Sequence, residues 1–481
     1  MLNLQLRQEF QGPHTPGTMI SLRQDGQGAT EISPDYILSI TYPTADVRTA
    51  LKNVSSSRAQ KPLVLLGDRG RGKSHIMALI HHALTHPQKV EQWASAWQSF
   101  ADFPELRDIS IEPDYHPISE PLHNQEYPLL WELLFAKHPY GDHARGKFEQ
   151  TGHPYPPRSL LEEMFQKQPT ALILDEFQKW FESLSDQPGT EGKKYRTWAE
   201  NFIQNLSELA QERPDILILV TSVLNSDSEA FRQIHRVGPV LIDFSGPTAR
   251  KDRQKLVLHR LFENRAQLDE SSIQNVVSSY ASERFRLKFS HHSSSEKPAC
   301  YQEVMDCFPF SPELHDLLDN QILMAEAAQE ARDLIRILAF VYSARGESVP
   351  LVTPADFFVD DDSCGVQSLL DSIATAGEQE RLREIAQRNL ETVRETTDEE
   401  LPHAREIIST LWMRSMTPAR APGATPPEIQ LDITRNEAID DNMFNNELAR
   451  IIENSMNVHG EQTAEKRLHF GVKNHAQRAW H

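Results

Sequence analysis

The chain has 481 residues, of which 39% are hydrophobic and 25% are charged. This length exceeds that of a chain that typically folds around one hydrophobic core, so we expect roughly two to four domains. The 69 acidic and 49 basic residues give a formal net charge of −20, which disfavours nonspecific nucleic-acid binding by the surface as a whole. A local basic patch, or a pore lined by a few Lys and Arg, would escape that restriction.

No apolar run approaches the roughly 20 residues that a membrane-spanning helix needs, and the N-terminus lacks the pattern of a signal peptide. The three cysteines, Cys300, Cys307 and Cys364, have no metal-ligand spacing and cannot all pair. We therefore expect reduced thiols in a cytoplasmic protein with no membrane partner.

The first predicted elements precede a short apolar strand. Residues 1–33 are polar and interrupted by Gly and Pro, which is typical of a flexible leader. Thr44 is a candidate N-cap for a helix over the sequence TADVRTALKNV. The apolar run Leu63–Leu66 then predicts a buried strand.

A glycine-rich loop follows that strand and leads into a helical pattern. Its spacing is G-x-x-x-x-G-K-[ST], the phosphate-binding loop, and the strand–loop–helix context supports this interpretation over a turn without a ligand. Backbone N–H groups and the helix N-terminus would bind phosphates, Lys73 would reach the β- and γ-phosphates, and Ser74 would hold Mg²⁺. The predicted ATP-binding residues are Gly67, Asp68, Arg69, Gly70, Arg71, Gly72, Lys73 and Ser74.

A second buried strand, Ala171–Leu174, ends in two carboxylates. Ligands bind at the carboxyl edge of open α/β sheets, so Asp175 would support Mg²⁺ through water and Glu176 would polarise the attacking water. Residues 87–158, rich in Pro, His and aromatic residues, precede this strand, and we expect them to form an insertion.

A third strand within Asp215–Asn225 is apolar until its last residues. Ser222, by strand position, or Asn225, by chemistry, could lie between the two earlier strand ends and orient water or the γ-phosphate. Asn225 could equally cap the next helix. Arg232 and Arg236 follow four residues apart, and each could be a surface ion-pair partner. We favour Arg236 as a residue acting in trans on a neighbouring subunit's nucleotide.

Together these motifs resemble an ATPase of the AAA+ superfamily. Three further segments, CFPFSPELHDLL, EARDLIRILAFVY and LVTPADFF, resemble the large AAA+ ATPases of BREX-type bacterial phage-defence systems, the PglY- and BrxC-like proteins. The resemblance covers residues 41–358, approximately. It implies a helical lid in which Arg332 or Arg336 contacts the nucleotide as a sensor, although an exposed amphipathic face would explain both arginines as well. It also implies self-association into a homo-oligomer such as a ring, and partners such as a methyltransferase or a nuclease.

Two features depart from that family pattern. Lys73 and Asp175 lie about 100 residues apart, more than a compact core needs, and the chain is short for a defence ATPase. The expected division is therefore a leader (1–33), an AAA+ core with a parallel sheet (34–265), a helical lid (266–360) and a C-terminal region (361–481).

The C-terminal region shows helix signals followed by a hairpin-like segment, the pattern of a winged-helix module. Such modules bind DNA or protein, and the concentrated basic residues here are Lys466, Arg467 and Lys473. The function predicted from sequence is an oligomeric ATPase of a phage-defence assembly that handles DNA or activates a partner. The alternatives are a nucleotide-gated scaffold with little hydrolysis and a DNA-replication initiator or loader.

Overall fold

The structure is a computed structural model of the chain. It describes all residues except 1–3, 12–21, 23–27, 56–60, 69, 101–102, 108, 112–114, 125–126, 128, 185–189, 245–246, 290–293, 324–329, 374–375, 398–400, 418–420 and 473–481. A few side chains at helix ends also lie outside the description. Among the described residues, no helix is both long and apolar enough to cross a bilayer.

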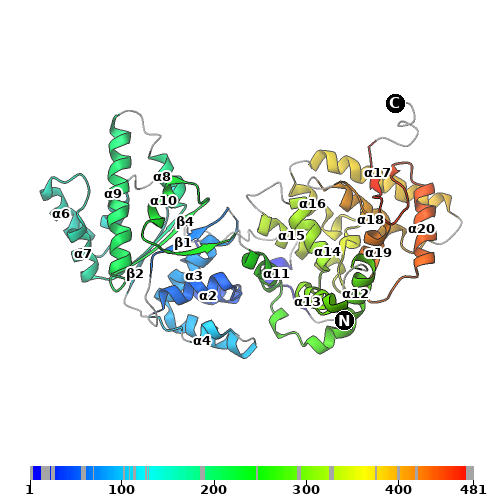
Figure 1. The fold of residues 1–481 in the computed structure, drawn as a ribbon, viewed down its shortest axis with the longest axis horizontal. Helices are drawn as coiled ribbons and strands as arrows, with labels where there is room; N and C mark the ends of the chain where they lie inside the picture. Colours follow the sequence, from blue (N-terminus) through cyan, green and yellow to red (C-terminus); the bar gives the residue numbers. More distant parts are fainter. Residues whose placement is uncertain are drawn as a thin grey trace. The chain divides into compact units, whose positions relative to one another are not determined.

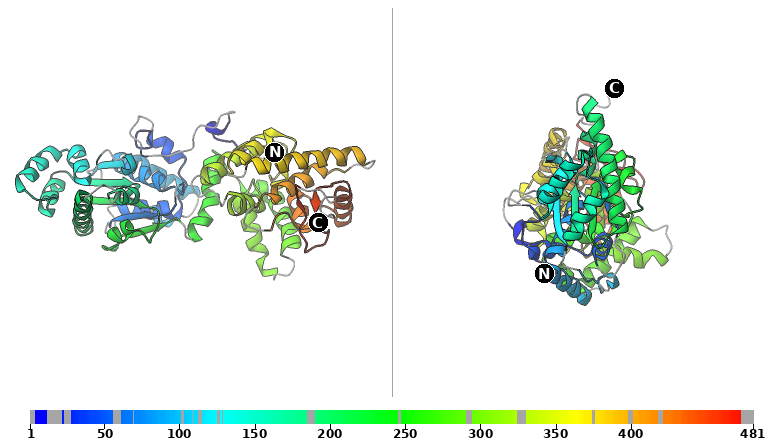
Figure 2. Two further views of the ribbon diagram at one scale, coloured as in Figure 1. Left: turned by 90° about the horizontal axis from the view of Figure 1, so that it is seen from above. Right: turned by 90° about the vertical axis from the view of Figure 1, so that its left-hand side faces the viewer.

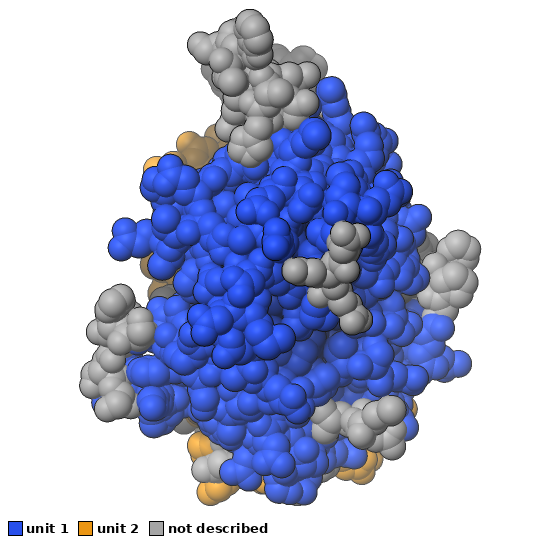
Figure 3. Space-filling view, turned by 90° about the vertical axis from the view of Figure 1, so that its right-hand side faces the viewer, with its two compact units in different colours: residues 1–18, 257–481 blue, residues 19–256 orange. Residues whose placement is uncertain are grey.

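The chain forms two compact units. Met19–Leu256 make up one, here called the α/β unit. The other, the helical unit, combines Met1–Thr18 with Val257–His481 (Figure 3). The expected end of the nucleotide-binding core at residue 265 therefore moves to 256, inside helix α11 (Pro247–Leu261).

A parallel five-stranded sheet organises the α/β unit, in the order β2-β3-β4-β1-β5 (Figure 1). Successive residues of a strand point to opposite faces, and both faces of the central strands are buried. Leu63 and Leu65 belong to one core cluster, whereas Val64 and Leu66 belong to the other. The strands are β1 (Leu63–Leu66), β2 (His116–Pro121), β3 (Thr170–Asp175), β4 (Leu217–Val223) and β5 (Val240–Asp243).

Helices cover both faces of this sheet (Figure 1). One layer contains α1 (Pro34–Ser39), α2 (Ala45–Val54), α3 (Lys73–Thr85) and α4 (Pro87–Phe100). The other contains α5 (Leu130–Lys137), α6 (Gly141–Thr151), α7 (Arg158–Lys167), α8 (Phe177–Ser183), α9 (Thr190–Glu212) and α10 (Glu229–His235). The expected α/β class with a parallel sheet is confirmed.

Residues 87–158 differ from the expected insertion because they supply an edge strand of the sheet. β2 pairs in parallel with β3 from His116↔Thr170 to Pro121↔Asp175. Its sequence, HPISEP, contains two prolines and no continuous apolar run. Proline is tolerated on an edge strand, where one side of the backbone needs no partner in the sheet. β2 is therefore a strand of the sheet, although its sequence alone predicts a strand only weakly.

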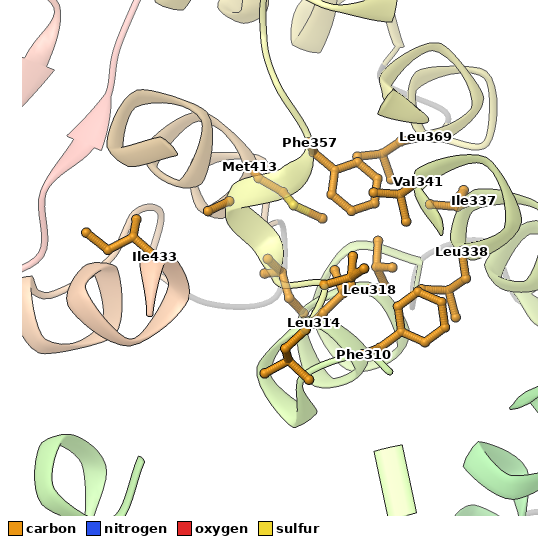
Figure 4. Packing of buried hydrophobic residues seen from close by; sticks show 14 of the residues in the cluster. Phe310, Leu314, Leu318, Ile337, Leu338, Val341, Phe357, Leu369, Met413 and Ile433 are labelled. Carbon is orange, nitrogen blue, oxygen red and sulfur yellow. The ribbon is translucent and has the colours of Figure 1, made fainter. Parts of the chain in front are cut away.

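The helical unit has one hydrophobic core (Figure 4). Figure 4 shows Phe357, from the expected lid, close to Met413, from the expected C-terminal region. The division at residue 360 thus crosses a single core. The helices are α12 (Glu270–Lys288), α13 (Lys297–Cys307), α14 (Pro312–Leu317), α15 (Glu330–Arg345), α16 (Val366–Asp371), α17 (Ala376–Thr396), α18 (Ala404–Ser415), α19 (Pro426–Ile433) and α20 (Asp441–Glu453).

Long helix α17, drawn in yellow to orange, runs along the outside of this unit (Figure 2). Its buried stripe of Leu382, Ala386, Leu390 and Val393 recurs at the three- and four-residue spacing of a half-buried helix. Glu384, Arg388 and Glu391 between them are exposed, whereas Arg383 is buried and donates to the Val359 carbonyl at 2.8 Å. The expected helical C-terminal region is confirmed.

The N-terminal residues are part of the helical core and differ from the expected flexible leader. Leu4, Leu6 and Phe10 are buried among its side chains. Leu6 forms an antiparallel bridge with Phe262, supported by hydrogen bonds from Arg7 N to the Leu261 carbonyl (2.9 Å) and from Glu263 N to the Gln5 carbonyl (3.0 Å). Alternating apolar residues in LNLQLRQEF carry this signal, which the surrounding polar residues obscure.

The end of the described chain contains α18, α19 and α20 followed by a two-stranded antiparallel hairpin, β6 (Val458–His459) and β7 (His469–Phe470). A bridge between Ala424 and Leu468 joins the segment before α19 to this hairpin. Lys466 pairs with Glu461, and Arg467 donates to the Gly423 carbonyl. Lys473 lies outside the described residues.

Candidate functional site

The glycine-rich loop leaves β1 and enters α3 directly. Gly67 and Gly72 have φ angles of 150° and 101°, which side-chain-bearing residues adopt with strain. A Cβ atom on Gly67 would also approach the Phe244 Cβ to 3.0 Å. Phe244, immediately after β5, thus lies against the loop, and its backbone N–H donates to the Leu66 carbonyl at 2.9 Å. The sequence offered no specific signal for this residue.

Lys73 begins α3 and is held over its own loop. Its ammonium donates to the carbonyls of Gly67 (2.5 Å) and Asp68 (2.6 Å). The side chain is buried, so the charge lies inside the loop and not on the outer surface. Of the other predicted loop residues, Gly70 and Arg71 are half-buried, Asp68 is exposed, and Arg69 lies outside the described residues.

The loop and the acidic strand meet through a direct hydrogen bond. The Ser74 hydroxyl donates to Asp175 Oδ2 at 2.5 Å, although these residues are 101 positions apart in the sequence. Asp175 is the last residue of β3 and is only 6% exposed. Hydroxyl and carboxylate oxygens are the ligand type that Mg²⁺ prefers, so this pair fits a magnesium site at the loop.

Ser222 lies between these two parts of the site because β4 lies between β1 and β3. Its hydroxyl donates to Asp175 Oδ1 at 2.6 Å and accepts from the Glu176 backbone N–H at 2.8 Å. The carboxyl ends of parallel strands meet at one edge of the sheet, which explains this convergence of three strands. Asp175 consequently accepts from the hydroxyls of Ser74 and Ser222, and Ser222 also fixes the backbone of Glu176.

Glu176 is the one described non-glycine residue with positive φ, at 54°. This left-handed conformation occurs where β3 ends and α8 begins. Such a conformation is costly for a residue with a side chain and is often found at functional sites. The carboxylate is 29% exposed and lies 3.3 Å from His123 Nδ1 and 3.8 Å from Lys179 Nζ.

His123 is a site residue that the sequence analysis missed. It belongs to the short 3-10 turn Leu122–Asn124, directly after β2. A polar residue after a strand of a parallel sheet would have been the signal, but that strand was not recognised. Because β2 neighbours β3, its end brings His123 beside Glu176.

Asn225 and Arg236 do not join this network of contacts. Asn225 is exposed, and its backbone N–H donates to Gln178 Oε1 at 3.2 Å. The cap of α10 is Ser228, whose hydroxyl accepts from Phe231 N at 3.1 Å, so the alternative of Asn225 as this helix cap is wrong. Arg236 follows α10 and is exposed, as is Arg232.

The two arginines expected to act as sensors belong to α15 in the helical unit. Arg336 donates to Ser372 Oγ at 2.8 Å and to Asp333 Oδ1 at 3.2 Å, both within that unit. The side chain of Arg332 lies outside the described part of the chain. A contact between either arginine and a nucleotide stays a prediction.

No protein-family model matches the chain, and no curated protein matches it significantly. Among solved structures, the ORC1 protein of Aeropyrum pernix in complex with DNA is similar over 91% of each chain, with 12% sequence identity and a TM-score of 0.33.

Proposed function

We propose that this chain binds and hydrolyses ATP as an ATPase of the AAA+ type. The observation that carries the proposal is the hydrogen bond between Ser74 and Asp175. It joins the phosphate-binding loop to the acidic strand end within one network that also includes Ser222 and the Glu176 backbone. ATP hydrolysis needs these two parts together, because Mg²⁺ must be held beside the phosphates.

The residues suggest a division of roles. Backbone N–H groups of the loop would bind the phosphates, and the Lys73 ammonium would exchange its loop carbonyls for phosphate oxygens. Ser74 and Asp175 would hold Mg²⁺, which supplies charge stabilisation for phosphoryl transfer. The Glu176 carboxylate would accept a proton from the attacking water, and Ser222 would position the backbone of Glu176.

We further propose that the protein acts as an oligomer, in which exposed Arg236 reaches a neighbouring subunit's nucleotide. An arginine supplied across a subunit boundary stabilises the charge of the transition state. Exposure of Arg236 fits this role, since a buried arginine could not reach another chain.

The finer proposal is that the oligomer belongs to a bacterial anti-phage assembly, with a methyltransferase or nuclease as partner. It rests on the resemblance of the FPFSPEL and RDLIRILA segments to the BREX-type ATPases. Residues of these segments include buried core positions such as Phe310, Leu314 and Leu338, so a shared packing pattern is part of that resemblance.

The test measures ATP turnover and assembly mass together, with and without duplex DNA, for wild type, Lys73→Ala and Glu176→Gln. We expect wild type to hydrolyse ATP, Glu176→Gln to accumulate the ATP-bound oligomer, and Lys73→Ala to do neither. ATP binding without turnover in wild type would instead favour a nucleotide-gated scaffold. A monomer that neither binds nor hydrolyses ATP would overturn the proposal.

A DNA-replication initiator or loader is a second candidate function. The observation in its favour is the order of α18, α19, α20 and the hairpin, with the bridge between Ala424 and Leu468, which is typical of a winged helix. Against it, Lys466 and Arg467 are already engaged within the unit. Duplex binding that weakens in Lys466→Glu, which perturbs the fold less than a change at Arg467, would favour this candidate.

A further inference from the structure

A hollow of about 420 Å³ in the α/β unit is lined by residues that take no part in the nucleotide site. Five of its lining residues come from α2, namely Ala45, Arg48, Thr49, Lys52 and Asn53. Lys61 precedes β1, and Glu105 belongs to the 3-10 turn Pro104–Leu106. We call this feature the α2 hollow.

The sequence of α2 separates a core face from the face that lines the hollow. Val47, Ala50, Leu51 and Val54 are buried against the sheet. Arg48, Thr49 and Lys52 recur at three- and four-residue spacing on the other side of the helix. Thr49 and Lys52 are therefore not needed for packing of α2, and their side chains remain available to a ligand.

The α2 hollow is cationic in a protein whose formal net charge is −20. Arg48 is held in place by Glu105 (3.3 Å), by the Pro43 carbonyl (2.5 Å) and by the Phe103 ring, 4.9 Å from its guanidinium carbon. Among the described residues, Lys52 and Lys61 have no ion-pair partner. Three basic side chains thus face one carboxylate.

Two hydrogen bonds between the Asn53 side chain and the Lys61 backbone fix the position of Lys61 relative to α2. Asn53 Nδ2 donates to the Lys61 carbonyl at 2.8 Å, and the Lys61 backbone N–H donates to Asn53 Oδ1 at 3.4 Å. The two unpaired ammonium groups are consequently carried on segments that are joined to each other. Anchoring of this kind lowers the conformational entropy lost when an anion binds.

We propose that the α2 hollow binds a small phosphate-bearing anion. Arg and Lys side chains, together with a hydroxyl such as that of Thr49, are the groups that bind phosphate oxygens. None of the described lining residues is aromatic, so the lining offers phosphate contacts and no ring on which a nucleobase could stack. The volume is ample for a diphosphate.

The experiment uses inorganic pyrophosphate as probe and isothermal titration calorimetry of the full chain in the Lys73→Ala background, which weakens binding at the phosphate loop. Lys52→Ala/Lys61→Ala is added to remove two cations of the hollow. The matched control is Lys147→Ala/Lys167→Ala, which removes the same charge from α6 and α7. We expect the hollow variant to lose about tenfold or more in affinity and the control about twofold or less.

A third variant gives an outcome that misfolding could not mimic. Glu105→Gln removes the one carboxylate of the α2 hollow and leaves Arg48 unpaired, so pyrophosphate should bind several-fold more tightly. Binding should also weaken as salt rises, because the lysines are not deeply buried. Absence of pyrophosphate binding in the Lys73→Ala protein, or equal affinities in all variants, would overturn the proposal.

Discussion

The two units use buried polar groups in different ways. In the α/β unit they gather at the carboxyl edge of one sheet, where Ser74, Asp175 and Ser222 form a chain of hydrogen bonds next to the half-buried carboxylate of Glu176. In the helical unit they form closed ion pairs inside the core, such as Arg284 with Glu313 at 2.7 Å and Arg414 with Asp432 at 2.8 Å. Polar groups at an open edge can act on a ligand, whereas closed pairs can only hold helices together.

The closed pairs also explain why two segments of the helical unit, FPFSPEL and LVTPADFF, carry an acidic residue among apolar ones. The glutamate of FPFSPEL is Glu313, which accepts from Arg284 and from the Tyr280 hydroxyl at 2.9 Å. The aspartate of LVTPADFF is Asp356, which is fully buried and pairs with Arg345 and Arg435, each at 3.0 Å. Unusual residues in these segments therefore have a structural reason.

The largest expected effect is at the proposed nucleotide site of the α/β unit. Glu176→Gln should lower kcat for ATP about 10²–10⁴-fold, the typical contribution of a general base, while the melting temperature stays close to wild type. Steady-state ATPase assays and thermal melts measure both. Glu149→Gln, on the exposed side of α6, is the control and should leave both unchanged. A stability loss as large as the activity loss would show that Glu176 is structural.

The next largest effect is at a closed ion pair of the helical unit. Glu313→Gln should destabilise the protein by about 3–5 kcal/mol, because it removes the one fully buried carboxylate that pairs with the buried Arg284 guanidinium. Urea unfolding measures the loss, and ATP affinity of the folded protein should not change. Glu303→Gln removes the other, half-exposed partner of Arg284 and should cost about 1 kcal/mol or less.

Acid should affect Glu313 in a defined range. Burial raises the pKa of the Glu313 carboxyl, but the charges of Arg284 and Lys288 outweigh burial and lower the pKa to about 2. A carboxyl with a lowered pKa stabilises the fold above its unfolded pKa and loses that contribution as pH falls through the folded value. The difference in urea midpoint between wild type and Glu313→Gln should therefore shrink below about pH 4.5. A constant difference down to pH 2 would contradict this.

A smaller effect separates Ser222 from Asn225, the two candidates that the sequence left open. Ser222→Ala should lower kcat about tenfold with little change in KM. The reason is that the backbone of Glu176, whose carboxylate would act on the attacking water, loses its hydrogen bond to the Ser222 hydroxyl. Asn225→Ala should change kcat less than about twofold, since Asn225 is exposed. Matched single-turnover assays decide between them, and the reverse order would assign the role to Asn225.

Phe244 tests how far the site depends on packing. Phe244→Ala should weaken ATP binding roughly three- to tenfold, with kcat nearly unchanged, because Gly67 and the loop lose the ring that supports them. Phe244→Leu should restore most of the affinity. Phe148→Ala, a half-buried aromatic residue of α6, is the control for general destabilisation. A fall in kcat alone would show that Phe244 acts elsewhere.

The smallest effect is a pH dependence near α2. Burial, followed by the carboxylates of Asp252 and Asp243, raises the pKa of Asp46 to about 6. A carboxyl with a raised pKa stabilises the fold at low pH, and that contribution is lost as pH rises through the folded value. Asp46→Asn should therefore gain in urea midpoint over wild type between about pH 4 and pH 7. Asp142→Asn, at an exposed position of α6, should show no such gain.

The sequence predicted the parts of the fold whose signals are local. The strands β1, β3 and β4 are continuous apolar runs, and the glycine spacing indicated the loop between β1 and α3. The order of the strands along the sequence does not show that β4 lies between β1 and β3 in the sheet. The sequence does predict a polar side chain at the end of β4. The contacts of Ser222 depend on this order.

Other features depended on pairings distant in the sequence. β2 has two prolines and becomes a strand through its pairing with β3. For the same reason His123, which follows β2, was not recognised. Residues 4–10 pack on residues more than 250 positions later, and their short apolar alternation does not by itself indicate those partners.

The N-terminal residues of the helical unit have a consequence for how the protein can be divided. Since Leu6 pairs beside Phe262, the chain enters the helical unit, leaves it for the whole α/β unit and then returns. Met19–Leu256 can be expressed as one uninterrupted gene fragment, whereas the helical unit needs a splice between residues 18 and 257. During synthesis, Leu6 must therefore wait for about 250 further residues before its partner Phe262 exists.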